Sequence, residues 1–222
     1  MHIIGIGHYS RVGKDTLASY LVQELERRGV SSRKASLAYK LKVVAHELYG
    51  WAGLREPEFY ETDEGQQYRQ VKLPELDLTP VEIWIKLGTD AVRDHVYVDT
   101  WVRLWLQTNY DEEVVIAPDM RTWNEASLFR KSRGWLVRLN RDGHSAISKL
   151  ETGLDNWTDW DFDLQNSGLE SLRQSAVMLA DEYMRCREAI QQKTDRAVDG
   201  MQHQVCDADS LRCLPPGRII PS

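Results

Sequence analysis

The sequence predicts a three-layer α/β fold, in which helices cover both faces of a central, mostly parallel β-sheet. Short apolar runs alternate along the chain with longer segments whose apolar residues recur at helical spacing. This alternation is typical of βαβ units and of a parallel sheet. The length of 222 residues is also sufficient to bury the core of one such domain, with small excursions from it.

Strands are expected where short apolar runs are bounded by glycine or polar residues, at 2–7, 32–38, 112–119, 135–143 and 160–168. In the first predicted helix, Leu17, Leu21 and Leu25 fall on one face and Gly29 provides a stop signal. Pro80 marks another helix start. The helices are expected at 15–29, 40–51, 79–95, 99–109, 124–134 and 169–190.

One domain is expected to span residues 1–190, with two excursions from it. The stretch 53–80 is polar and lacks clean periodicity, which indicates a loop-rich insertion. Residues 142–157 form a flexible-looking connection between the last two strands. The polar segment 191–222 has no periodicity and ends in LPPGRIIPS, so we expect a flexible tail.

Composition excludes several classes of protein. The formal net charge of −6 argues against a surface that coats nucleic acid. The three cysteines are sparse and lack C-x-x-C spacing, which suits a reducing compartment better than a disulfide framework or a zinc site. No apolar run approaches the ~20 residues of a membrane span, and no signal peptide is recognisable. We therefore expect a cytoplasmic protein with no membrane partner; a homodimer is left open.

The loop between the first strand and the first helix has the features of a phosphate-binding P-loop. Such a loop needs converging backbone amides, a lysine that reaches the terminal phosphates and a helix directly behind it. Gly13, Lys14 and Thr16 meet these demands, although His8 stands where the usual spacing has glycine and Asp15 separates Lys14 from Thr16. The alternative is a polar turn in which Lys14 is only solvated.

Further polar residues follow the predicted strands. Asp119 ends an apolar strand, so it is a candidate ligand of a Mg²⁺-bound water, or else the N-cap of the next helix. Thr16 is the candidate hydroxyl for Mg²⁺, or else satisfies a local backbone group. Arg121 can point at the same crevice, or else pair with Glu125 or Asp119. Arg141 opens the connection 142–157 and could close over a nucleotide with it.

Six segments in order also resemble a known family. They are SRVGKDT, SLAYKLKVVAHELYG, KLGTDAVRDHVYVDTWV, VVIAPDMRTWNEA, VRLNRDG and DFDLQNSGLESL. Together they cover most of residues 3–172 and resemble the phage-type deoxynucleoside monophosphate kinases, a branch of the P-loop nucleoside monophosphate kinases. The chain departs from the pattern at His8, Val12, Lys40 and Asp142, where that family has glycine, serine, proline and proline.

The resemblance implies a P-loop NTPase fold with excursions that bind the acceptor monophosphate and close as a lid over ATP. It implies transfer of the γ-phosphoryl group of ATP to a deoxynucleoside monophosphate with Mg²⁺, in the host cytoplasm if the protein is phage-encoded. The implied catalytic residues are Lys14, Arg121 and Arg141. ATP would contact Arg11, Val12, Gly13, Lys14, Asp15, Thr16 and Asn166, and Mg²⁺ would involve Thr16 and Asp119. The acceptor would contact Ser10, Ala38, Tyr39, Lys42, Arg93 and Arg121.

Several of these residues have a simpler alternative. Arg11 and Lys42 could be solvated, and Arg93 could form a helical surface pair with a neighbouring aspartate. Asn166 could set a turn with Gly168 instead of reaching the adenine. For the whole protein, the alternatives are another small-molecule P-loop kinase, such as one acting on dephospho-coenzyme A, and a nucleotide-binding module without catalysis.

Overall fold

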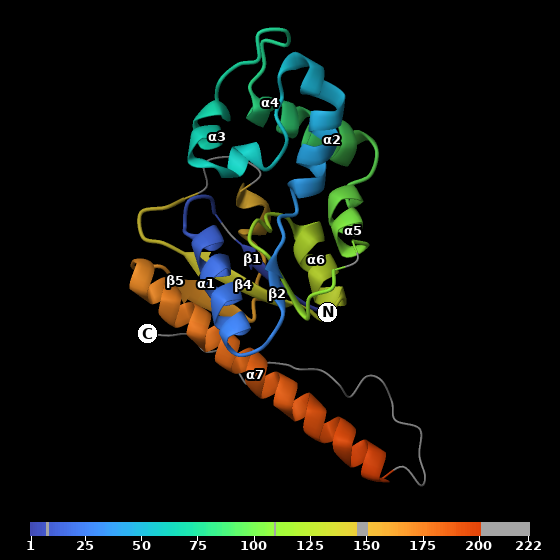
Figure 1. Ribbon diagram of the computed structural model, residues 1–222, viewed down its shortest axis with the longest axis vertical. Helices are drawn as coiled ribbons and strands as arrows, with labels where there is room; N and C mark the ends of the chain where they lie inside the picture. Colours follow the sequence, from blue (N-terminus) through green and yellow to red (C-terminus); the bar gives the residue numbers. More distant parts are fainter. Residues whose placement is uncertain (8, 109, 146–150, 201–222) are drawn as a thin grey trace. The chain divides into compact units, whose positions relative to one another are not determined.

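The computed structural model describes residues 1–7, 9–108, 110–145 and 151–200 (Figure 1). The chain divides into two compact units. The first unit combines Met1–Lys34 with Glu112–Ser222, and the second is Ala35–Asp111. The predicted insertion at 53–80 lies inside the second unit.

The first unit is built on a parallel sheet that has five strands in the described part of the chain. The strands are β1 (His2–Gly7), β2 (Ser32–Lys34), β3 (Val114–Ala117), β4 (Trp135–Asn140) and β5 (Phe162–Gln165). Their order across the sheet is β2-β3-β1-β4-β5, and each neighbouring pair is parallel. The prediction of an α/β fold with a central parallel sheet flanked by helices is confirmed.

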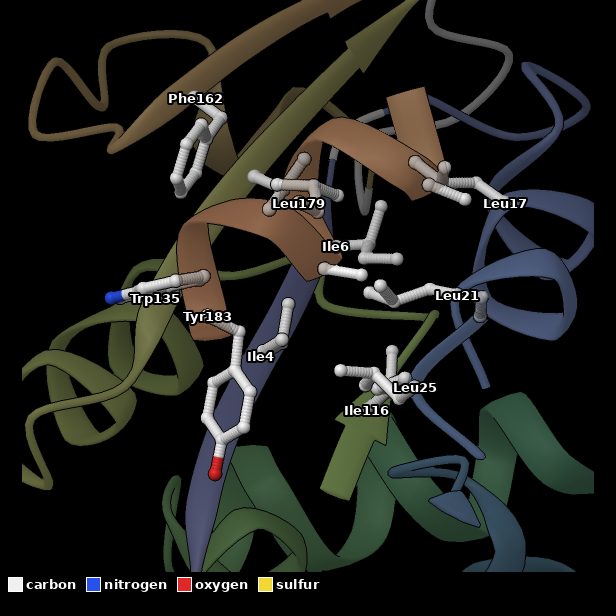
Figure 2. Packing of buried hydrophobic residues seen from close by; sticks show 14 of the residues in the cluster. Ile4, Ile6, Leu17, Leu21, Leu25, Ile116, Trp135, Phe162, Leu179 and Tyr183 are labelled. Atoms are coloured by element: carbon white, nitrogen blue, oxygen red, sulfur yellow. The ribbon is translucent and has the colours of Figure 1, made fainter. Parts of the chain in front are cut away.

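Two helices cover one face of this sheet, α1 (Lys14–Arg27) and α7 (Leu169–Gly200). Ile4 and Ile6 of β1 point between them and are fully buried (Figure 2). Leu17, Leu21 and Leu25 recur every fourth residue of α1 and meet this apolar surface, which is the helical periodicity seen in the sequence. Strands β1 and β3 are apolar on consecutive positions because both faces of the sheet are covered there.

The opposite face of the sheet is covered by α6 (Trp123–Lys131) and by the segment that precedes β5. Gly5 of β1 faces α6 so closely that a Cβ atom there would lie 2.6 Å from Cδ2 of Phe129. Gly7 likewise faces the ring of Trp160, which a Cβ atom would approach to 2.8 Å. The two glycines therefore allow β1, the central strand, to pack directly against bulky side chains.

The second unit is helical. It contains α2 (Tyr39–Tyr49), η1 (Gly50–Ala52), η2 (Phe59–Glu61), α3 (Asp63–Tyr68), α4 (Pro80–Ile85), η3 (Lys86–Arg93) and α5 (Thr100–Leu106). Its core is formed by Ala45, Leu54, Tyr60 and Ile83. Helix α2 packs closely against η3. The closeness is seen at Gly88 of η3, where a Cβ atom would lie 2.4 Å from Cδ2 of Leu41 in α2.

Some boundaries differ from those expected. The second strand stops at Lys34, and Ala38 is already the N-cap of α2. The single helix expected at 79–95 is α-helical to Ile85 and then continues as the π-helix η3. Helix α7 runs to Gly200, ten residues beyond its expected end at Ile190, whereas 201–222 lie outside the described residues. No described helix combines the length and apolar composition of a membrane span.

Candidate functional site

The carboxyl edge of the sheet gathers the predicted site residues of the first unit. Strand β1 leads into the loop before Lys14, β3 into Asp119 and Arg121, β4 into Arg141, and β5 into Asn166. The chain leaves β1 for α1 on one face, and leaves β3 for α6 on the other. Adjacent strands whose connections diverge in this way form the switch point at which open α/β sheets bind ligands.

The backbone of the loop after β1 alternates in conformation. Arg11 has φ of 61° and Gly13 has φ of 100°, while Val12 between them is not among the described residues with positive φ. Successive residues of alternating handedness turn their N–H groups toward a common point and form an anion-binding nest. The exposed Arg11 adopts this conformation without the freedom of glycine. His8, whose geometry was in question, lies outside the described residues.

Lys14 is the first residue of α1 and is turned into the loop. Only 6% of it is exposed, and its Nζ donates a hydrogen bond to the carbonyl oxygen of Tyr9. A lysine at a helix start would otherwise extend into water, because burial of an ammonium group is costly unless it is paired. The solvated alternative for Lys14 does not fit this position.

The two residues that follow Lys14 in α1 are more exposed to solvent than Lys14. Thr16 is half-buried in the first turn of the helix, and the exposed Asp15 forms an ion pair of 3.5 Å with Lys34. The N-cap of α1 is Gly13, which has no side chain to cap the helix. Helix N-termini of this kind can bind anions through their backbone amides.

Asp119 and Arg121 lie half-buried between β3 and α6. The N-cap of α6 is Thr122, so Asp119 does not have the capping role considered as its alternative. The Glu125 carboxylate accepts hydrogen bonds from the backbone amides of Arg121 at 2.7 Å and Thr122 at 2.9 Å. These bonds fix the backbone that presents the Arg121 side chain.

Arg141 follows β4 and is exposed. Of the predicted lid at 142–157, residues 146–150 lie outside the described residues. The later part is packed into the first unit, since Leu154 and Trp157 are buried. The Asp155 carboxylate accepts a hydrogen bond of 3.0 Å from the hydroxyl of Tyr9. The end of this connection is thus anchored beside the loop after β1.

Asn166 follows β5 and is buried. Its Nδ2 donates a hydrogen bond of 2.7 Å to the carbonyl oxygen of Val12, and its Oδ1 accepts one of 2.9 Å from the amide of Gly168. The alternative of a turn with Gly168 is therefore present in the structure. The contact with Val12 was not foreseen, and contact with adenine stays a prediction.

An ion pair that the sequence analysis did not predict joins β4 and β5 near the end of β1. Arg138 is the β4 residue in register with Gly7, and its guanidinium is paired with the carboxylate of Asp163 on β5. Asn140 donates a 2.6 Å hydrogen bond to the same carboxylate. The hydrogen bond to Asp163 raises the pKa of Arg138. The alternation of polar with apolar residues in these two strands was the available signal.

Of the six predicted acceptor residues, Ser10 and Arg121 belong to the first unit, and the other four belong to the second unit. Ala38, Tyr39 and Lys42 are at the start of α2, and Arg93 ends η3. Lys42 is not simply solvated, because its Nζ donates a 2.8 Å hydrogen bond to Glu61 and lies 5.2 Å from the ring centroid of Trp84. The hydroxyl of the exposed Tyr39 donates to Glu58 at 2.7 Å, which lowers the pKa of that carboxyl.

The residues predicted to involve Mg²⁺ fit a site shared with a nucleotide. Within the described ranges, no group of three or more His, Cys, Asp and Glu side chains could hold a metal ion by itself. Mg²⁺ in nucleotide sites keeps several waters and is bound by one or two protein oxygens together with the phosphates. Thr16 after β1 and Asp119 after β3 supply such oxygens at neighbouring strand ends.

Comparison with known proteins gives one informative similarity. No family model matches the chain. The chain is 29% identical over 158 residues to a protein of Acanthamoeba polyphaga mimivirus named "Putative deoxynucleotide monophosphate kinase". The matched region makes up 64% of this chain and 76% of the viral protein. This similarity supports a kinase-like family. The parallel α/β fold is consistent with that of a P-loop kinase.

Proposed function

We propose that the protein is a deoxynucleoside monophosphate kinase that uses ATP as phosphoryl donor. The observation that carries the proposal is the loop after β1, where two residues with positive φ precede the buried Lys14, whose Nζ donates to the carbonyl oxygen of Tyr9 in the same loop. A buried cation at a helix N-terminus attracts an anion of high charge, such as a triphosphate. The name of the mimivirus protein supports the nucleotide monophosphate as acceptor.

In the proposed reaction, a phosphate oxygen of the acceptor attacks the γ-phosphorus of ATP. The bond between this phosphorus and the β–γ bridging oxygen breaks, so that ADP leaves and a deoxynucleoside diphosphate forms. The protein must align the two nucleotides and stabilise the charge on the transferred group. Lys14 would bind the β- and γ-phosphates after leaving the carbonyl of Tyr9, and the amides of residues 11–16 would bind the phosphate oxygens.

Further residues of the first unit act on the same phosphates in this proposal. Thr16 and Asp119 would hold Mg²⁺ and its waters, and the chemistry that the ion supplies is neutralisation of phosphate charge. Arg121 would contact the phosphate groups from the end of β3. Arg141 would approach from the end of β4 when the connection 142–157 closes as a lid, and would stabilise charge on the transferred phosphoryl group.

Within the second unit, Ala38, Tyr39, Lys42 and Arg93 would contact the acceptor. Tyr39 offers an aromatic ring for stacking against the base, with the backbone of Ala38 beside it. Lys42 and Arg93 would bind the acceptor phosphate. Lys42 bonds the Glu61 carboxylate with one of its three N–H donors, so a bound phosphate would share the ammonium group with that carboxylate or replace it. The phosphate, with its higher charge, is the stronger partner for Lys42.

A coupled assay of ADP release tests the proposal. The four deoxynucleoside monophosphates, their ribose forms and dephospho-coenzyme A serve as separate acceptors. We expect ADP release that depends on at least one deoxynucleoside monophosphate. The same assay with Lys14→Ala should show turnover reduced at least a hundredfold, whereas Lys131→Ala, at an exposed lysine on α6, should match the wild type.

Each other outcome rejects the assignment in a defined way. Release with dephospho-coenzyme A alone would identify a different small-molecule kinase. Binding of ATP without release for any acceptor would indicate a nucleotide-binding module. Wild-type rates in Lys14→Ala would refute the role assigned to this lysine.

A further inference from the structure

We propose that Asn166 is a positioning residue that fixes the orientation of one peptide unit in the phosphate-binding loop. The inference rests on the proposed function, since it assumes that the loop binds the phosphates of ATP. It differs from a direct contact between Asn166 and the nucleotide. The argument uses the two hydrogen bonds of the Asn166 side chain, the packing of Gly13 and the planarity of the peptide bond.

The hydrogen bonds determine the orientation of the Asn166 amide. Its Nδ2 faces the carbonyl oxygen of Val12 at 2.7 Å, and its Oδ1 faces the amide of Gly168 at 2.9 Å. With the oxygen and nitrogen exchanged, oxygen would face oxygen on one side and two donors would meet on the other. Each side-chain atom therefore has one assigned partner, and the buried side chain cannot release either without leaving a polar group unsatisfied.

The position of Asn166 depends on the first turn of α7. Gly168 has φ of 148°. Its carbonyl oxygen accepts a hydrogen bond from the amide of Leu172 in the first turn of α7. On the other side, the backbone amide of Asn166 donates to the carbonyl of Asn140 at 2.8 Å. The side chain thus extends from a rigid junction between the sheet and α7 to a loop 154 residues earlier in the sequence.

Gly13 lies directly against this side chain. A Cβ atom on Gly13 would be 2.7 Å from Nδ2 of Asn166 and 3.2 Å from Cδ1 of Leu172. Gly13 also has φ of 100°, a conformation that residues with a Cβ atom rarely adopt. The loop therefore approaches Asn166 as closely as a glycine backbone allows.

The peptide bond between Val12 and Gly13 links the hydrogen bond of Asn166 to phosphate binding. In a planar trans peptide, the C=O and the following N–H point in opposite directions. Because the Val12 carbonyl points at Asn166, the Gly13 amide points away from Asn166. Without the hydrogen bond, this peptide could rotate and place a carbonyl oxygen where the nest needs an N–H donor. A carbonyl in that place would repel phosphate.

Two variants separate the contributions of the side chain. Asn166→Asp keeps an oxygen for the Gly168 amide but places a second oxygen opposite the Val12 carbonyl. Asn166→Ala removes both bonds. Asn140→Ala is the matched control, since Asn140 lies at the same edge and bonds Asp163 instead of the loop. For each protein, titration calorimetry would measure the dissociation constants of ATP, inorganic triphosphate and adenosine, with Mg²⁺ present.

We expect Asn166→Asp and Asn166→Ala to weaken the binding of ATP and of inorganic triphosphate by the same factor, about tenfold or more. The affinity for adenosine should stay unchanged. Asn140→Ala should bind all three like the wild type. Weakened binding of ATP with unchanged triphosphate affinity would overturn the inference and indicate contact with the nucleoside. Unchanged affinity for both would overturn it while leaving the proposed function intact. A wild type that binds neither ATP nor triphosphate would reject both.

A measurement on the wild-type protein does not depend on how the variants fold. The ¹⁵N resonances of the Asn166 side-chain amide and of the Gly13 amide can be followed by NMR during titration. Inorganic triphosphate and ATP should shift both signals alike. A shift of the Asn166 side-chain signal with ATP but not with triphosphate would overturn the inference.

Discussion

Replacement of His2 with phenylalanine should flatten the dependence of stability on pH. His2 begins β1, and its ring lies edge-on to Trp135 with centroids 4.9 Å apart and 5.4 Å from the ring centroid of Tyr183. Its Nε2 is buried and has no hydrogen-bond partner among the described residues. Burial and, to a smaller extent, the N-terminal ammonium group lower the pKa of His2 from 6.5 to about 4.

The sign and size of the effect follow from this pKa. Between pH 6.5 and 4, the unfolded state binds a proton at His2 that the folded state does not, so stability falls as the pH falls through this window. The full shift corresponds to about 3 kcal/mol, of which about 2 kcal/mol is lost by pH 5. The carboxylate of Glu113 is near this ring but already has two partners: it accepts a hydrogen bond from the Tyr183 hydroxyl at 2.8 Å and forms an ion pair of 3.0 Å with Arg187.

Urea unfolding at pH 7.5 and pH 5 measures this effect. The wild type should lose about 2 kcal/mol more than His2→Phe between the two pH values, because phenylalanine keeps the aromatic contacts and cannot be protonated. The matched control is His95→Gln, at an exposed histidine, which should lose as much as the wild type. Equal losses in the wild type and His2→Phe would mean that His2 is not buried in its neutral form, and the packing described for this end of the sheet would be wrong.

Two further predictions concern the site and the sheet. Arg141→Ala should lower kcat about a thousandfold, as loss of an arginine that stabilises the transferred phosphoryl group does, and change ATP affinity far less; equal effects in steady-state kinetics and calorimetry would argue against a lid role. Asp161 accepts hydrogen bonds from the Leu136 amide at 2.7 Å and from Arg130 at 2.9 Å, so Asp161→Ala should cost about 1–3 kcal/mol in urea unfolding. Asp159→Ala removes an exposed partner of the same arginine and should cost under about 1 kcal/mol; a larger cost than that of Asp161→Ala would refute this ranking.

Local patterns in the sequence were sufficient for the strands and most helices of the first unit. The apolar residues of β1 and the helical spacing of Leu17, Leu21 and Leu25 each reflect burial against a neighbour, so they are visible in a short window. The order of the strands is not visible there, because β1 pairs with β3 and β4, more than a hundred residues later in the sequence. The change from α-helix to π-helix after Ile85 was not expected from the sequence either.

The same limit applies to the candidate site. A polar residue that follows an apolar strand is expected at the carboxyl edge of the sheet, and Asp119 and Asn166 do lie there. Their partners could not be predicted, because a residue type does not specify which distant backbone group it contacts. The bond from Asn166 to Val12 and the pairing of Arg138 with Asp163 are contacts of this kind.

The central claim is that the loop after β1 holds the phosphates of ATP around Lys14. A crystal structure of the protein with Mg²⁺ and a non-hydrolysable ATP analogue tests it most directly. We predict phosphate oxygens about 3 Å from the amides of residues 11–16 and from Nζ of Lys14, with this nitrogen no longer bonded to the Tyr9 carbonyl. Phosphates bound elsewhere, with Lys14 still bonded to Tyr9, would contradict the account.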